Sequence, residues 1–124
     1  MEFKDGKAIY VQIADYISEK ILKGKWIEGD RIPSVREFAV DIEVNPNTVM
    51  RAYSYLQDEG IIYNKRGIGY FVGENSMEKV LKLKKDDFIQ VELPYFFKTL
   101  DMLNIDFEAL KVMYEKYQLE RSIK

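Results

Sequence analysis

Residues 34–60 contain the start and stop signals of two short helices separated by a tight turn. Ser34 and Glu37 have the S-x-x-E spacing of a capping box, in which the hydroxyl and the carboxylate each accept a hydrogen bond from a backbone N–H. Asn45 followed by Pro46 has the pattern of an N-cap residue and a proline in the first helical position, so a second helix is predicted to begin at Pro46. Gly60 is the predicted stop of this second helix.

The second helix is predicted to have one buried and one exposed face. The buried face has apolar residues at three- and four-residue spacing, which are Val49, Ala52, Tyr53 and Leu56. The opposite face carries Asn47, Met50, Arg51 and Ser54. Because arginine pairs with guanine or phosphate and asparagine with adenine, Asn47 and Arg51 are candidate DNA contacts. The alternatives are a solvated Arg51 paired with a carboxylate and, for the helix pair, a purely structural hairpin.

The chain after Gly60 is predicted to form a β-hairpin. Residues 61–65 and 70–72 are β-prone runs, and residues 66–69 between them have the pattern of a turn. Lys65 and Arg66 lie at the tip. Helix, turn, helix and basic hairpin together predict a winged helix-turn-helix, in which the second helix lies in the major groove and the wing follows the phosphates. The alternative for Lys65 and Arg66 is that they only keep the hairpin soluble.

A helix over residues 10–23 is expected to supply the scaffold of this domain. The isoleucines that recur every four residues form its apolar stripe, which consists of Ile9, Ile13, Ile17 and Ile21. Gly24 is the predicted stop. Trp26 and Ile27, in the loop that follows, are expected to be buried.

The composition excludes several classes of protein. The chain has no cysteine and no histidine, so disulfides, thiolate chemistry, His or Cys zinc sites and histidine general bases are excluded. No cofactor is predicted. No apolar run approaches the roughly 18 residues that cross a bilayer, and the N-terminus lacks the apolar core of a signal peptide. We therefore expect a cytoplasmic protein without a membrane partner.

The net charge of −2, from 19 basic and 21 acidic residues, argues mildly against a nucleic-acid binder. Phosphates, however, respond to charges within a Debye length of about 8–10 Å, so local placement matters more than the total. In a winged helix, Arg36, Arg51, Lys65 and Arg66 would converge on one face. DNA binding therefore stays the preferred prediction.

Residues 74–124 are predicted to form two or three helices, with Pro94 interrupting one of them and Asp106 capping the last. About fifty residues in so few helices bury little core by themselves. Their aromatic residues are too many to leave in water, and a second copy of the chain is the simplest cover. The predicted dimer interface consists of Phe88, Tyr95, Phe96, Phe97, Leu100, Leu110, Tyr114 and Tyr117.

Three blocks of residues 9–72 resemble the N-terminal domain of the GntR family of bacterial transcription regulators. They occur in the family's order and read Y-V-Q-I-x-x-x-I-x-x-x-I-L-x-G-x-W-x-x-G-D-R-I-P-S-V-R-E-F-A, V-N-P-N-T-V-x-R-A-Y-x-x-L-x-x-E-G and R-G-I-G-Y-F-V. The middle block and the short tail look most like the YtrA-type subfamily. The resemblance implies a repressor of an operon such as one encoding an ABC transporter.

The resemblance also implies a set of DNA contacts. The matching motif positions are Arg36, Asn45, Asn47, Thr48, Arg51 and Gly67. For Asn45 a plain N-cap is the alternative. Many family members carry arginines where this chain has Pro46 and Met50, so their guanine contacts are not implied here.

We predict a mainly α (α+β) protein with a winged helix-turn-helix DNA-binding domain at residues 1–73 and a helical dimerisation domain at 74–124. It should bind a palindromic operator in double-stranded DNA as a homodimer. A small-molecule effector, if one exists, should bind between the two domains or at the dimer interface. The alternatives are a protein-interaction module that does not bind DNA, and an enzyme. Some family members carry an aminotransferase-like domain, for which this chain is too short.

Overall fold

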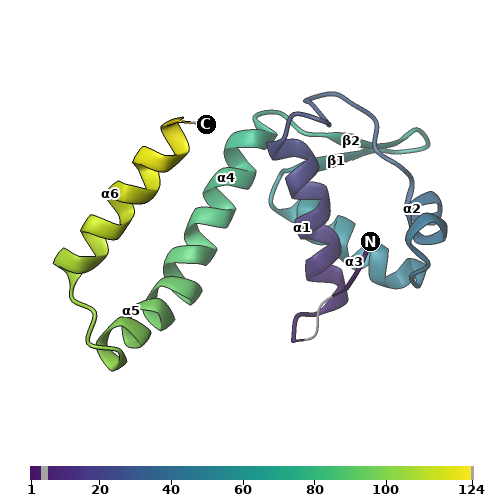
Figure 1. The fold of residues 1–124 in the computed structure, drawn as a ribbon. Coiled ribbons are helices and arrows are strands. Elements are labelled where there is room, and N and C mark those ends of the chain that lie inside the picture. Colours follow the sequence, from purple (N-terminus) through teal and green to yellow (C-terminus); the bar gives the residue numbers. More distant parts are fainter. Residues whose placement is uncertain (4–5, 124) are drawn as a thin grey trace. The chain divides into compact units, whose positions relative to one another are not determined.

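The computed structural model describes residues 1–3 and 6–123 of the chain (Figure 1). The chain folds into two compact units, residues 1–84 and 85–124. The fold is mainly helical with one small hairpin, as predicted. The elements in chain order are α1 (Ile9–Leu22), α2 (Val35–Ile42), α3 (Pro46–Asp58), β1 (Ile62–Lys65), β2 (Gly69–Val72), α4 (Ser76–Asp87), the π-helical turn η1 (Phe88–Glu92), α5 (Leu93–Met102) and α6 (Phe107–Ile123).

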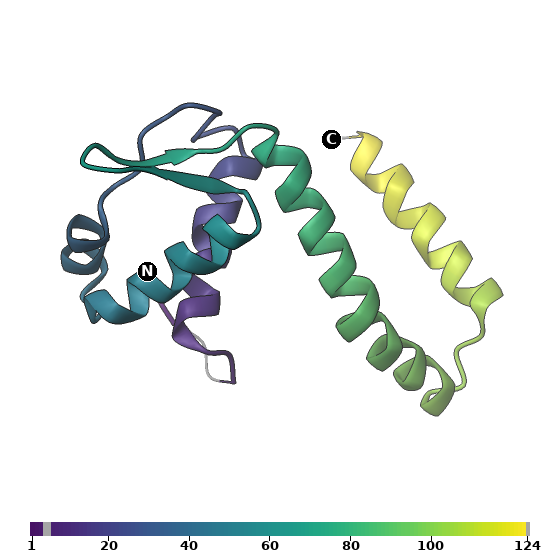
Figure 2. The ribbon, with the colours of Figure 1, turned by 180° about the vertical axis from the view of Figure 1, so that it is seen from behind.

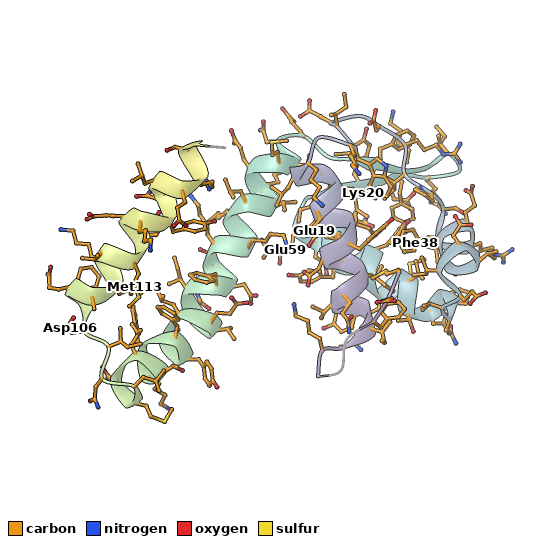
Figure 3. All side chains as sticks on the ribbon, in the orientation of Figure 1. Glu19, Lys20, Phe38, Glu59, Asp106 and Met113 are labelled. Atoms are coloured by element: carbon orange, nitrogen blue, oxygen red, sulfur yellow. The ribbon has the colours of Figure 1, made fainter. Side chains whose placement is uncertain are left out.

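The core of the first unit lies where α1, α2 and α3 meet below the β1–β2 hairpin in both ribbon views (Figures 1 and 2). The predicted stripe of α1 is confirmed for Ile13, Ile17 and Ile21, whereas Ile9, in the first residue of the helix, is 37% exposed. Phe38 of α2 lies between α1 and α2 (Figure 3), and its ring meets those of Tyr16 and Tyr53 edge-on at 6.0 and 6.2 Å.

The predicted capping box begins α2. The Glu37 N–H donates to Ser34 Oγ at 3.1 Å, and the Ser34 N–H donates to Glu37 Oε1 at 3.2 Å. Hydrogen bonds from the Ser34 backbone N–H and, to a smaller extent, from the Ser34 hydroxyl lower the pKa of the Glu37 carboxyl, because they favour its charged form. The start of α2 is therefore held by its own side chains.

The predicted cap and faces of α3 are also confirmed. Asn45 Oδ1 accepts from the Asn47 N–H at 2.8 Å, and Pro46 occupies the first turn. The predicted apolar face is fully buried, and its members are Val49, Ala52, Tyr53 and Leu56. The Asn45 cap sets where α3 begins, and the buried apolar residues set which side of the helix faces the core. Together they determine which residues of α3 are exposed.

The hairpin has the predicted strands, with Ile62 opposite Val72 and Lys65 opposite Gly69. The loop after α1 pairs along its edge, because the Ile32 N–H donates to the Tyr70 carbonyl at 3.0 Å and the Val72 N–H donates to the Asp30 carbonyl at 2.8 Å. The wing is therefore tied to the loop that leads into α2.

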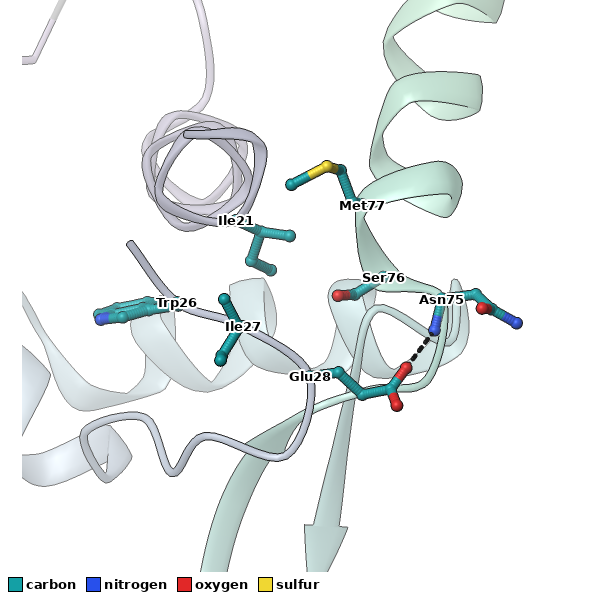
Figure 4. Close-up of a pocket in the computed structure, with 7 residues that line it drawn as sticks. All are labelled: Ile21, Trp26, Ile27, Glu28, Asn75, Ser76 and Met77. Carbon is teal, nitrogen blue, oxygen red and sulfur yellow. Dashed lines mark hydrogen bonds between the residues drawn. The ribbon is translucent and has the colours of Figure 1, made fainter. Parts of the chain in front are cut away.

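The expected burial of Trp26 and Ile27 is wrong for Ile27, which is 59% exposed, while Trp26 is half-buried. Ile32 fills the core from this loop instead, because the edge pairing with β2 directs the chain there. Ile27 and Trp26 line a shallow apolar hollow of about 140 Å³ together with Met77 (Figure 4).

The linker between β2 and α4, residues 73–75, is fixed by a hydrogen bond to the loop after α1. The Asn75 N–H donates to Glu28 Oε1 at 2.8 Å (Figure 4), with Asn75 in a left-handed conformation at φ 53°. Ser76 and Val80 are buried, and Val80 belongs to the core of the first unit. The first compact unit therefore continues past Gly73 to Lys84. The division of functions at residues 73 and 74 remains a prediction.

The second unit contains η1, α5 and α6. The predicted disturbance at Pro94 takes the form of the π-helical turn η1 just before it. Proline lacks an N–H and crowds the preceding turn of a helix, and a wider turn relieves both. Asp106 caps α6 as predicted, since its Oδ1 accepts from the Ala109 N–H at 2.8 Å.

Candidate nucleic-acid interface

The outer face of α3 carries the candidate base-reading residues. Asn47, Met50, Arg51 and Ser54 are all exposed, while Thr48 is half-buried. Residues at three- and four-residue spacing lie on one side of a helix, so these four exposed side chains form one surface. The capped N-terminus and the buried apolar face of the same helix keep this surface outward.

Arg51 packs against the first helix. Its guanidinium carbon lies 4.0 Å from the centre of the Tyr10 ring, and Tyr10 is half-buried against the core. The alternative of an Arg51 paired with a carboxylate is not observed among the described residues. Stacking on an aromatic face leaves the N–H donors at the edge of the guanidinium plane available to a ligand.

A chain of ring contacts joins α3 to the wing. Tyr53 is fully buried, and its hydroxyl donates to the Pro33 carbonyl at 2.6 Å. Burial raises the pKa of this hydroxyl, so it stays a donor. The ring of Tyr70 meets that of Tyr53 at 4.9 Å and 84°, and the Tyr70 hydroxyl lies 3.8 Å from Met50 Sδ. The wing strand β2 is thus fixed against the outer face of α3.

The tip of the wing carries the predicted cations. Lys65, Arg66 and Gly67 are exposed, and Gly67 has φ 79°, which a turn of this kind requires of a glycine. The Lys65 ammonium lies 5.1 Å from the centre of the Phe71 ring, so the ring beneath it orients it. A tip of this kind presents positive charge and a backbone with no side chain at Gly67, which suits close approach to phosphate.

The remaining two predicted contacts lie at the helix starts. Arg36 is exposed in the first turn of α2. Asn45 is the N-cap of α3, which is the alternative interpretation of this residue, and its Oδ1 is occupied by the Asn47 N–H. The amide nitrogen is then the atom through which Asn45 could reach DNA. The roles of all the predicted contacts in DNA binding remain predictions.

Sequence reasoning missed two tyrosines at this surface, Tyr10 and Tyr70, which hold Arg51 and Met50. No local signal marks either contact, because each joins residues from different elements, such as Tyr70 and Met50, 20 positions apart. The helical period places Met50 on the exposed face but indicates no role for it.

Among the described residues, no group of three or more carboxylates could hold a metal ion, and none of the described helices meets the length and hydropathy that a membrane crossing requires.

A second exposed surface lies in the compact unit of residues 85–124. Of the predicted dimer residues, Leu100 and Leu110 are half-buried and the six aromatic ones are exposed, with Tyr95 74% exposed and Phe96 41% exposed. Large apolar side chains that gather on an exposed surface usually mark a contact with another molecule. Their place in a dimer interface remains a prediction.

The fold and the polar face of α3 define a winged helix-turn-helix protein. The model of the family described as bacterial regulatory proteins, gntR family, matches residues 9–72, which is more than half of the chain. The chain belongs to the GntR family of bacterial regulatory proteins. The predicted family is confirmed, and with it the prediction that the chain is a transcriptional regulator and not an enzyme.

Two relatives from Bacillus subtilis are similar to the chain. The uncharacterized HTH-type transcriptional regulator YhcF is 36% identical over 109 residues, which cover 88% of each protein. The HTH-type transcriptional repressor YtrA is 46% identical over 76 residues, which cover 61% of this chain and 58% of YtrA. The resemblance to the YtrA type is therefore confirmed.

Two solved structures are similar as well. A putative transcriptional regulator of the GntR family from Bacteroides thetaiotaomicron is 46% identical with a TM-score of 0.81, over 92% of this chain and 99% of that one. The N-terminal domain of AraR, in complex with a mutant of the operator ORR3, is 28% identical with a TM-score of 0.54. That alignment covers 56% of this chain and 100% of the AraR domain.

Proposed function

We propose that the chain is a cytoplasmic DNA-binding repressor that binds a palindromic operator as a homodimer. Its target would be an operon such as one that encodes an ABC transporter. The single observation that carries the proposal is the exposed face of α3 with Asn47 and Arg51 outward, beside a wing whose tip is basic, in a member of the GntR family. The repressor YtrA and the AraR domain bound to operator DNA support it.

In the proposed complex, α3 enters the major groove and the wing follows the adjacent phosphates. Asn47 and Arg51 have the donors for base edges, and Arg51 reaches outward from its ring contact with Tyr10. The remaining predicted contacts position the domain on the phosphate backbone, and these are Arg36, Asn45, Thr48, Lys65, Arg66 and Gly67. Repression then follows from occupation of the operator.

The proposed dimer forms through the aromatic surface of residues 85–124. The residues proposed to become buried in the dimer interface are Phe88, Tyr95, Phe96, Phe97, Leu100, Leu110, Tyr114 and Tyr117. When two winged-helix domains are linked in a dimer, binding of one to its half-site raises the effective concentration of the other at the second half-site, which a single domain lacks. A chain with a net charge of −2 gains little from general attraction to DNA, so this linkage matters for its affinity.

The same net charge favours a second candidate, a winged-helix module that binds another protein and not DNA. The two differ in their response to salt. Binding of DNA releases counterions, so its affinity falls steeply with salt, whereas a protein contact without charge pairing changes little. For a protein with about 6 to 10 phosphate contacts, raising the salt from about 50 to about 200 mM should lower the affinity for DNA by several orders of magnitude. An affinity that stays constant over this range would favour the second candidate.

The direct test is selection of bound duplexes from a random pool with the full chain. We expect an enriched palindrome whose half-sites are separated by about one helical turn, or a multiple of one turn, because a two-fold dimer reads a two-fold site. The double variant Asn47→Ala/Arg51→Ala is the matched control and should enrich no sequence. A pool that stays random with the unaltered chain would refute the proposed function.

A further inference from the structure

Met50 is an apolar side chain in the middle of the polar outer face of α3. It is 43% exposed, and Asn47, Arg51 and Ser54 on either side of it are exposed as well. An exposed thioether gains nothing from water, whereas the neighbouring amide, guanidinium and hydroxyl groups do. The position therefore offers a small apolar contact within a surface that otherwise offers hydrogen bonds.

The thioether of Met50 is held in place from the core outward. Methionine has three rotatable side-chain bonds and normally samples many positions at a surface. Here the Tyr70 hydroxyl lies 3.8 Å from Met50 Sδ, and the Tyr70 ring packs on Tyr53 at 4.9 Å. Tyr53 is in turn fully buried and bonded to the Pro33 carbonyl at 2.6 Å. Met50 is thus an exposed apolar side chain whose position is restricted by its contact with Tyr70.

The chemistry of the major groove selects one partner for such a group. Guanine and adenine present N7 acceptors there, and cytosine presents an amino donor, none of which a thioether satisfies well. Thymine alone adds an apolar group, its C5 methyl, to the floor of the groove. A thioether in van der Waals contact with that methyl buries apolar surface on both sides.

We propose that Met50 is a specificity-determining residue that contacts the C5 methyl of a thymine in each operator half-site. The inference rests on the proposed function, because it places α3 in the major groove. It goes beyond that function by assigning to Met50 the chemical group that it recognises. The hydrogen-bonding residues Asn47 and Arg51 would then read the neighbouring base pairs.

The experiment replaces each thymine of the selected operator by uracil, one position at a time, and measures binding of the full chain by fluorescence anisotropy. Uracil keeps the pairing with adenine and loses only the methyl group. We expect about fourfold weaker binding at one position per half-site, the change that loss of one buried methyl-sized group produces. Met50→Ala should bind the thymine and uracil operators equally well, and Met50→Leu should keep the discrimination.

Val40→Ala is the matched control, because Val40 is an apolar residue, 76% exposed, on α2 and outside the face of Met50. It should leave the discrimination unchanged. Met50→Gln, which is unbranched and of similar length, replaces Met50→Ala if that variant does not give the helical circular-dichroism spectrum of the parent. Discrimination between thymine and uracil that persists in Met50→Ala, or in Met50→Gln where it is used, would reflect the shape of the DNA and overturn the proposal.

The two proposals fail in different ways. A chain that enriches no duplex fails the proposed function. The inference about Met50 fails alone if the chain enriches an operator but the half-site contains no thymine. It also fails alone if no thymine position shows a discrimination against uracil that depends on Met50.

Discussion

The two compact units differ in what they do with their apolar residues. Among the described residues, all members of the buried core lie in residues 1–84, from Ile13 of α1 to Val80 of α4. In residues 85–122 none of the described side chains is buried, and large apolar ones such as Tyr95 and Phe107 are at least 70% exposed. One unit has a hydrophobic core of its own, and the other presents its apolar side chains to the solvent.

This difference indicates which contacts each unit depends on. Burial of a Val or Ile side chain contributes about 1.5–3 kcal/mol, so a unit with a continuous core is stable as a single copy. Helices whose apolar side chains lie open gain that contribution only from a partner. The comparison therefore predicts that changes in the first unit act at any protein concentration, and that changes in the second act through dimer formation.

The largest effect is expected for a truncation in the core of the first unit. Ile17→Ala should lower the free energy of unfolding by about 2–5 kcal/mol, because Ile17 is fully buried and leaves a cavity. Urea denaturation followed by circular dichroism measures it. Ile9→Ala, in the same helix at a residue that is 37% exposed, is the control and should cost about 1 kcal/mol or less. Equal losses in both variants would contradict the position of the core.

The next effect separates the reading of bases from binding of the backbone. Asn47→Ala and Arg51→Ala should each weaken binding to the selected operator by about 1–3 kcal/mol and leave binding to random duplexes nearly unchanged. Anisotropy titrations with both duplexes measure this. Ser54→Ala, on the same exposed face, is the comparison for a small polar side chain. Similar losses on operator and random DNA would assign Asn47 and Arg51 to backbone contacts.

A chain that ends at Lys84 tests the second unit. It keeps Val80 in the core, so it should fold, sediment as a monomer and bind the operator at least about tenfold more weakly than the full chain. A chain that ends at Gly73 lacks Val80 and Ser76 and should be less stable than the longer one. A dimer of the truncated chain, or operator binding as tight as that of the full chain, would show that the second unit has another role.

The sequence predicts most reliably what short spacing controls. The capping box of Ser34 and Glu37 and the cap at Asn45 join residues two or three positions apart, and both are present. The buried face of α3 follows from the helical period. The exposure of Ile27 was not predictable in this way, because it depends on the pairing of its loop with β2.

The contacts between elements, in the candidate interface and elsewhere in the first unit, could not be predicted from the sequence. The Tyr10 ring beneath Arg51 joins α1 to α3, and the Glu28–Asn75 hydrogen bond joins residues 47 positions apart. The burial of Val80 likewise depends on where the linker directs α4. Local patterns fix which face of α3 is exposed, and packing decides how its side chains are held.

The smallest effect is expected for the charges at the wing tip. Each Lys or Arg that neutralises a phosphate releases about 0.9 of a counterion, so Lys65→Ala and Arg66→Ala should each lower the log–log salt slope by about one. Both should weaken binding to operator and random duplexes alike, because phosphates carry no sequence information. Titrations at several salt concentrations measure the slopes.

Lys111→Ala is the matched control for the wing variants, because Lys111 is an exposed lysine on α6 in the second unit. In the proposed complex only the first unit contacts phosphates, so the slope of this variant should equal that of the parent chain. Charge at Lys65 and Arg66 then acts locally, which reconciles DNA binding with a net charge of −2. If Lys65→Ala and Arg66→Ala keep the parent slope, the wing does not touch the phosphates, and the affinity must come from α3 and the start of α2 alone.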